Sequence, residues 1–163
     1  MRLLIFALVF VTQSFAIQYD LPKIRKAYEQ AAKDETTAKN LLIQVEALSS
    51  NNTLMLAYKG AITMILAKFQ LNPFSKLSYF NKGKTILEQA IAKENNNLEI
   101  IYLRYAIQSN VPSFLDYKKN MDSDKRFLLN TIHTSKDKDL NVRIINFLKA
   151  SGNLSAAEYK LLY

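Results

Sequence analysis

The sequence predicts an all-α protein built from antiparallel helical hairpins. Glycine and proline each occur only three times in 163 residues, a composition that disfavours turn-rich β folds. Apolar residues recur every three or four positions along most of the chain, which is the spacing of one face of a helix. About eight such segments with short polar connections predict helices that pair with their neighbours in the sequence.

The first four helices are predicted from their start and stop signals. Asp20 and Pro22 are typical of a helix cap and a first helical turn, and Asp34 marks the next start. Asn72 and Pro73 are expected to end the third helix, whose apolar stripe is the clearest in the chain. These signals predict helices over residues 20–31, 34–48, 54–69 and 75–94.

Residues 98–108 are nearly all apolar, so the fifth helix is expected to be central. Their β-branched side chains also fit a strand, but the sequence offers no second strand, and an isolated strand leaves its backbone unsatisfied. A break at residues 110–112 ends this helix. Further helices are expected over residues 113–119, from 122 or 123 to about 132, over 140–150 and over 154–162, with a charged loop at 136–139.

Residues 1–16 predict a cleavable export signal. Arg2 supplies the positive start, residues 3–11 supply an apolar run, and Ser14 and Ala16 are the small residues before the cut. The run is shorter than the roughly 20 apolar residues that span a bilayer, and an uncleaved anchor is the alternative. We therefore expect an exported protein, periplasmic or secreted, with no membrane span after cleavage. Residues 17–163 are expected to form a single all-helical domain.

The composition argues against several classes of chemistry. The chain has no cysteine, and therefore no disulfide, thiolate metal site or cysteine nucleophile. His133 is the only histidine, and the sequence has neither a nucleophile elbow nor a glycine-rich phosphate loop. Residues 122–124 and 137–139 have D-x-D spacing without the rest of a calcium loop, so we interpret them as a helix cap and a solvated loop. We expect no cofactor, no metal and no enzymatic activity.

The formal net charge is +8, carried mostly by lysines that are spread along the chain. Nucleic-acid binders more often concentrate arginine and aromatic residues in one patch, so no nucleic-acid partner is expected. The lysines are expected to form the solvated faces of helices. A weak affinity for anionic lipid or polysaccharide surfaces is the alternative.

Two segments resemble tetratricopeptide-type helical repeats. Gly83, Leu87 and Ala90 have the spacing of the small, large and small positions of a second repeat helix, and Asn95 stands where the family often has proline. Residues 147–157 resemble the family's helix–turn–helix. The chain departs from the family in its period, since the third and fifth helices begin 44 residues apart rather than about 34, and in having no tryptophan. The resemblance covers residues 54–110 and 140–162 and implies a right-handed array of α-α hairpins. In composition the chain also resembles small exported helical proteins of Bacteroidota, which implies no particular activity.

Glu99 and Arg104 are the only charged residues in the apolar fifth helix. A buried charge needs a partner, and their separation of five residues does not place them on one face. Arg104 is therefore expected to pair with Asp116 or Asp122. A structural ion pair is one interpretation and a binding groove is the other, because tyrosines nearby suit a recognition surface. The predicted groove residues are Glu99, Tyr102, Arg104, Tyr105, Asp116 and Tyr117.

The leading hypothesis is an exported, non-catalytic helical-repeat protein that binds a protein or peptide partner in a groove, in an oligomeric state that the sequence leaves open. One alternative is a surface-associated protein that binds anionic lipid or polysaccharide. The other is an enzyme that uses two carboxylates to process glycans.

Overall fold

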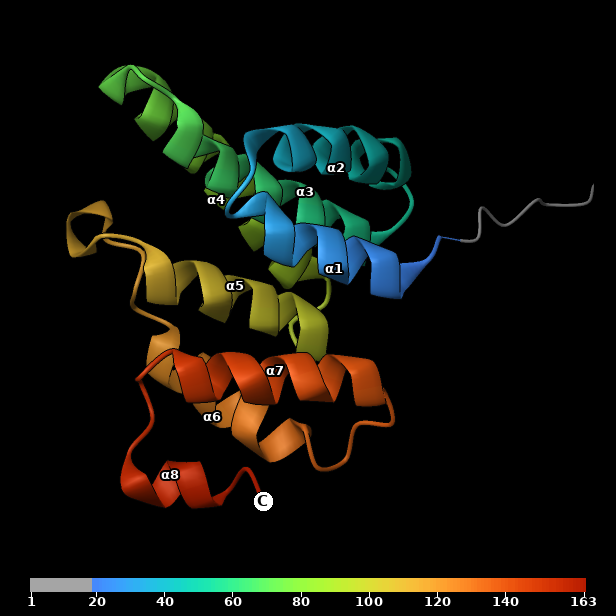
Figure 1. The fold of residues 1–163 in the computed structure, drawn as a ribbon, viewed down its shortest axis with the longest axis vertical. Helices are drawn as coiled ribbons and strands as arrows, with labels where there is room; N and C mark the ends of the chain where they lie inside the picture. The colour runs from blue at the N-terminus through green and yellow to red at the C-terminus, as the bar shows by residue number, and fades with distance from the viewer. Residues whose placement is uncertain (1–18) are drawn as a thin grey trace, which may run out of the picture.

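The computed structural model describes residues 19–163, and every regular element in that range is helical (Figure 1). The elements are α1 (Leu21–Ala31), α2 (Glu35–Leu48), α3 (Thr53–Leu66), the 3-10 turn η1 (Ala67–Phe69), α4 (Pro73–Lys93), α5 (Leu98–Asn110), the 3-10 turn η2 (Ser113–Leu115), α6 (Met121–Thr131), α7 (Lys138–Ala150) and α8 (Ala156–Lys160). The predicted all-α class with eight helices is confirmed. The predicted export signal lies outside the described residues.

Side-chain caps begin every described α-helix except α6. The Asp20 carboxylate accepts a hydrogen bond from the backbone N–H of Lys23, as its position before Pro22 predicts. The prediction for the fourth helix is wrong by two residues, because α4 begins at Pro73 with Asn72 as its cap. Proline has no N–H to leave unsatisfied at the first helical position, so Pro73 starts α4. The preceding helix ends earlier, since α3 stops at Leu66 and η1 at Phe69.

Three of the predicted boundaries and caps in the C-terminal half are wrong. The helix expected over residues 113–119 is only the three-residue turn η2, because Asp116 adopts a left-handed conformation (φ 46°) that no α-helix continues. The charged loop expected at 136–139 contains the start of α7, and Asp137 is its cap. Neither Asp122 nor Asp124 caps α6, whose N-cap position is Asn120.

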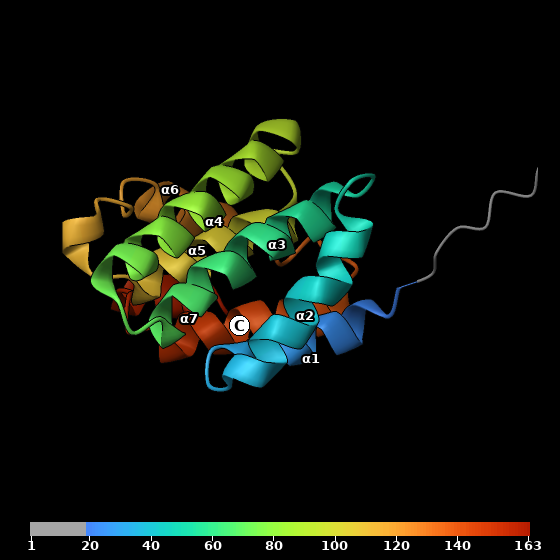
Figure 2. The same ribbon diagram turned by 90° about the horizontal axis from the view of Figure 1, so that it is seen from above.

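The helices pack as adjacent antiparallel pairs. Helices α1 to α4 form the upper part of the molecule in Figure 1, α5 crosses its middle, and α6, α7 and α8 lie below it. Figure 2 shows from above how α3 and α4 lie side by side along the length of the array. Residues Glu99 to Gln108 of α5 are all buried, so the central position predicted for the fifth helix is confirmed.

Helices α3 and α4 touch through a pair of glycines. A Cβ atom added to Gly83 would lie 2.6 Å from the carbonyl oxygen of Gly60, and one added to Gly60 would lie 2.5 Å from the backbone nitrogen of Leu87. No side chain fits at either position without moving a backbone. The two glycines therefore set the distance between these helices.

Candidate functional site

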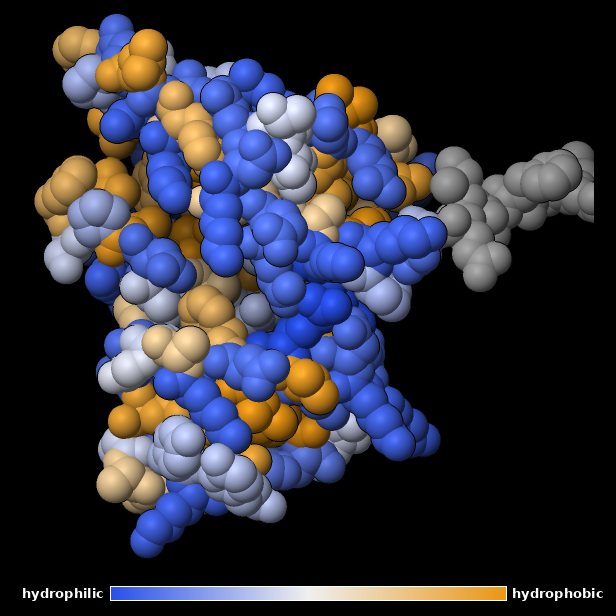
Figure 3. Space-filling view, in the orientation of Figure 1, coloured by the Kyte–Doolittle hydropathy of each residue, from blue (hydrophilic) through white to orange (hydrophobic). Residues whose placement is uncertain are grey.

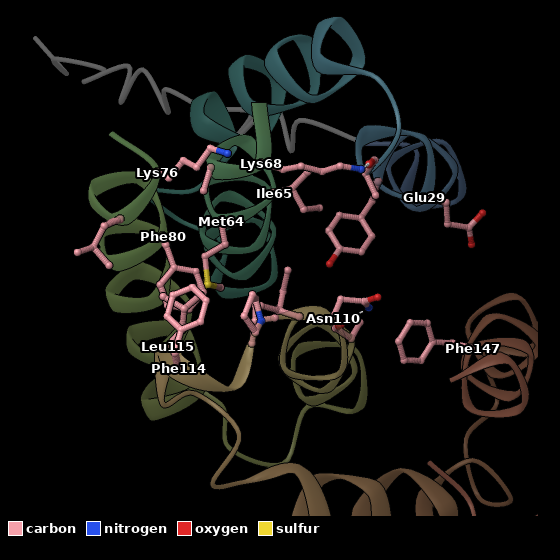
Figure 4. A pocket seen from close by; sticks show the side chains of 18 of the residues that line it. Glu29, Met64, Ile65, Lys68, Lys76, Phe80, Asn110, Phe114, Leu115 and Phe147 are labelled. Carbon is pink, nitrogen blue, oxygen red and sulfur yellow. Dashed lines mark hydrogen bonds between the residues drawn. The ribbon is translucent and has the colours of Figure 1, made fainter. Parts of the chain in front are cut away.

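An apolar groove of about 880 Å³ lies between the upper helices and α5 (Figure 4). All four odd-numbered helices line it, together with α4 and the turns η1 and η2. Its apolar residues are Tyr28, Ala32, Met64, Ile65, Ala67, Pro73, Leu77, Phe80, Tyr102, Ala106, Ile107, Val111, Pro112, Phe114, Leu115 and Phe147. We call this feature the groove.

Edge-to-face aromatic pairs hold two of its walls. The ring of Tyr28 on α1 packs against Tyr58, with ring centroids 5.5 Å apart, and the ring of Tyr102 packs against Phe147 of α7 at 5.7 Å. Burial raises the pKa of Tyr28 and of Tyr102. Both phenols are therefore neutral at physiological pH, and the aromatic walls carry no charge.

Three charged residues line the groove. The Lys68 ammonium donates to the Ala32 carbonyl at the end of α1, at 2.8 Å, and its side chain extends toward α1 in Figure 4. Lys76 lies on the α4 side of the groove. Glu29 lies at the opposite side and accepts a hydrogen bond from Arg143 at 2.5 Å. Within the described residues Lys76 makes no ion pair, so the end formed by η1 and α4 presents an uncompensated positive charge.

Glu99, a predicted groove residue, lies in the core rather than in the groove. Its carboxylate accepts two hydrogen bonds from Arg25, at 2.8 and 2.7 Å, and one from the Tyr58 hydroxyl at 2.6 Å. The same guanidinium binds Asp137 and Asp139 at the start of α7. These five residues, which we call the Arg25 cluster, join α1, α3, α5 and α7.

Charge pairing controls the protonation of the Arg25 cluster. Burial alone lowers the pKa of Arg25, but its carboxylate partners outweigh that effect and the net shift is upward. The hydrogen bond from Arg25 lowers the pKa of Asp137, and the hydrogen bond from Arg143 lowers that of Asp139. Burial and the adjacent Glu99 carboxylate raise the pKa of the Tyr58 hydroxyl. Asp137 and Asp139 therefore form ion pairs and are not the solvated loop that D-x-D spacing predicted.

Arg104 pairs with Asp124, not with Asp116 or Asp122. Two parallel hydrogen bonds of 2.7 Å join the guanidinium to the Asp124 carboxylate, and a third of 3.3 Å reaches Glu88 on α4. Burial raises the pKa of Asp124, and Arg104 offsets only part of that shift. Asp124 is thus a core ion-pair partner. Asp116 is exposed on the surface.

The three predicted tyrosines occupy three different environments. Tyr102 lines the groove, and it is the one residue that the groove shares with the predicted set. Tyr105 is fully buried, and within the described residues its hydroxyl has no hydrogen-bond partner. Tyr117 is buried and donates to Glu88 at 2.6 Å. The predicted set therefore divides between the groove, the core and the surface.

Sequence reasoning missed Arg25, Tyr58 and the groove itself. The sequence did contain one signal, the small number of arginines: five against seventeen lysines. In the structure, Arg25 and Arg104 both make bidentate contacts with buried carboxylates. A guanidinium fits a carboxylate with two parallel hydrogen bonds, whereas an ammonium does not. Arg25 and Arg104 are the two buried arginines among the described residues, and both are paired in this way, whereas Arg126 is exposed.

The comparisons with known proteins add no assignment. No family model, no curated protein and no solved structure matches this chain. Among residues 19–163, no group of His, Asp or Glu is arranged to hold a metal ion, and none of the helices described there has the length and apolarity needed to cross a membrane.

Proposed function

We propose that the chain is a non-catalytic helical scaffold whose groove binds an apolar segment of a partner protein. The observation that carries the proposal is the groove itself: about 880 Å³, lined mostly by apolar and aromatic side chains, with few polar groups at its ends. Concave apolar sites of this size are the usual form of a binding site.

The chemistry of the walls favours a helical segment. The groove is built from helices, whose backbone groups are bonded within each helix, so the walls offer an incoming strand no row of backbone partners. A helix satisfies its own backbone and needs from the groove only contact with its apolar side chains. Lys76, which makes no ion pair within the described residues, favours a segment that carries an acidic residue at the α4 side of the groove.

The distribution of carboxylates supports a binding role over a glycan-processing one. Glycoside hydrolysis needs two acids that flank the reacting bond. Among the described residues, Glu29 is the one carboxylate that lines the groove, and it is bound to Arg143. Glu99 and Asp124 are bound to arginines in the core.

A peptide-display selection tests the proposal. Random peptides are selected on the wild-type protein and then measured against two variants at exposed alanines. Ala32→Trp places a large ring in the groove, whereas Ala47→Trp is the matched control on α2, away from it. Selected peptides should bind Ala47→Trp like the wild type and Ala32→Trp about tenfold or more weakly, the effect of losing one anchor side chain.

Two outcomes would contradict the proposal. The first is that no peptide is enriched on the wild-type protein. The second is that enriched peptides bind Ala32→Trp as tightly as the wild type, which would place their site elsewhere.

A further inference from the structure

We propose that one edge of the molecule docks on the surface of an anionic lipid bilayer. The edge consists of four exposed apolar residues at two neighbouring tips, and we call it the apolar edge. Leu71, Phe74 and Leu77 stand at the tip between α3 and α4 and are 98%, 84% and 48% exposed, and Phe114 of η2 is 84% exposed. Large apolar side chains gathered in this way mark an interaction site.

The two tips point to the same side of the molecule. In Figures 1 and 2 the start of α4 and the turn η2 both project at the left of the array, and Figure 3 shows apolar side chains over both tips. Leu77 and Phe114 also line the same groove, so the groove opens between the two tips. A flat surface is therefore able to contact both tips at once.

The charge around the edge selects an anionic surface. Residues 67–87 contain four lysines and no aspartate or glutamate, and Lys118 and Lys119 follow η2. Lysines beside an anionic bilayer each add about 1 kcal/mol of attraction, or about fivefold in binding. Asp116 is the one acid within residues 111–121.

The form of the edge favours lipid over a protein partner. The polar residues Asn72 and Ser75 stand between Leu71, Phe74 and Leu77 in the sequence, so the apolar side chains of the edge alternate with polar ones. Separate side chains enter the boundary between headgroups and acyl chains without a preformed pocket. A protein partner needs one pocket for each of them.

This inference goes beyond the proposed groove function and is tested separately from it. Leu71 and Phe74 do not line the groove, whereas Leu77 and Phe114 do. Substitutions at the first two positions therefore report on the edge without changing the walls of the groove.

A local fluorescence reporter tests the edge in the full chain. The chain has no tryptophan, so Phe74→Trp places a single one at the edge, and Ile43→Trp is the matched control at a 70% exposed position on α2. Residues 3–11 are also apolar and could bind vesicles on their own. Binding of the full chain to vesicles therefore does not test the edge, whereas a fluorescent reporter at position 74 does.

Each variant is mixed with vesicles of equimolar phosphatidylglycerol and phosphatidylcholine, and with vesicles of phosphatidylcholine alone. The emission of Phe74→Trp should shift to the blue with the anionic vesicles and be quenched by brominated lipid, while that of Ile43→Trp stays unchanged. The shift should fall as salt is raised from about 0.1 M to about 1 M, because the screening length falls from about 10 Å to about 3 Å.

A second pair of variants measures the energy of insertion. Leu71→Ser in the Phe74→Trp background should weaken the partition measured by the emission shift about tenfold, the loss of one buried apolar side chain. Val142→Ser, at a 56% exposed position on α7, is its control and should leave the partition unchanged.

Three results would overturn the inference: no shift of Phe74→Trp with anionic vesicles, an equal shift of Ile43→Trp, or a shift that salt does not weaken. A shift of Phe74→Trp on addition of a groove-selected peptide, without any response to vesicles, would assign the edge to a protein partner instead. Loss of peptide binding in Ala32→Trp is independent of all of these results.

Discussion

Replacing Gly83 with alanine tests the close crossing of α3 and α4. The added methyl group would lie 2.6 Å from the Gly60 carbonyl oxygen and from the Met64 nitrogen, about 0.8 Å short of the 3.4 Å at which ordinary contact begins. Both obstacles are backbone atoms, which a change of rotamer does not relieve. The helices must therefore separate and lose packing along their shared face.

The expected size of the effect follows from two opposing contributions. Overpacking costs about 1–3 kcal/mol, and backbone obstacles place Gly83→Ala at the upper end of that range. Replacing glycine with alanine inside a helix stabilises that helix by about 1 kcal/mol. We expect the free energy of unfolding to fall by about 2 kcal/mol, which moves the urea midpoint by about 1 M at a slope of about 2 kcal/mol per M.

The assay is equilibrium unfolding in urea, followed by circular dichroism. Gly152→Ala is the comparison, because Gly152 has φ of +68° and nothing within 4 Å of an added Cβ, and it should cost about 1 kcal/mol from the left-handed conformation alone. The double variant at Gly60 and Gly83 should cost less than the sum of the two single variants, since both open one crossing. A stabilised or unchanged Gly83→Ala would refute the crossing.

Three further predictions concern charge and backbone conformation. Arg25→Met should lower the free energy of unfolding by about 3–5 kcal/mol in urea titrations, because it leaves the Glu99 carboxylate buried without its cation. Lowering the pH should destabilise the fold through Asp137 and Asp139. The pKa values of both carboxyls in the folded state lie below their unfolded value of about 3.9. The stabilisation from the two carboxylates is therefore fully present above about pH 3.9 and is lost as the pH falls through the folded-state pKa values. The urea midpoint measured from pH 7 down to about pH 2 reports this loss. Asp116→Val should cost about 1–2 kcal/mol in thermal melts and Asp116→Asn almost nothing, because asparagine accepts φ of 46° and a β-branched residue does not.

Each of these predictions has its own control or contrary result. Arg126→Met removes an exposed arginine from α6 and should change stability by less than about 0.5 kcal/mol, so a similar value for Arg25→Met would contradict the buried pairing. The double variant Asp137→Asn and Asp139→Asn should show a shallower acid dependence than the wild type, and an equal slope would assign the dependence to other carboxylates. Equal melting temperatures for the two Asp116 variants would argue against the left-handed conformation.

Local sequence signals were sufficient for most of the fold. Apolar stripes at helical spacing identified the helices, and caps such as Asp20 and Asp34 located their starts, because both signals act within one or two turns. The prediction failed at Asp116, where an aspartate tolerates a left-handed conformation without requiring one. It also failed at Pro73, which is compatible with both the end of one helix and the start of the next.

The candidate site depended on contacts that the sequence does not encode locally. Glu99 was correctly singled out as a charge in an apolar helix, but its partner Arg25 lies 74 residues earlier in the chain. Arg104 pairs with Asp124 and not with Asp116, which is nearer to it in the sequence. Asp116 lies in a left-handed turn and is exposed on the surface. The groove is lined by residues from five helices and two turns that are far apart in the sequence, so no single segment carries a pattern for it.

The Arg25 cluster also changes how the ends of the array depend on one another. In an open repeat array each unit contacts only its neighbours, and a terminal unit frays on its own. Here Arg25 on α1 binds Asp137 across 112 residues of sequence, and Glu29 binds Arg143 across 114, so charged side chains join α1 directly to α7. Detaching either α1 or α7 breaks the same bonds, and the amide protons of the two helices should exchange with one common opening free energy. Glu29 and Phe147, which line the groove on these two helices, are thereby held at a fixed separation, so the ion pairs between α1 and α7 set the width of the groove there.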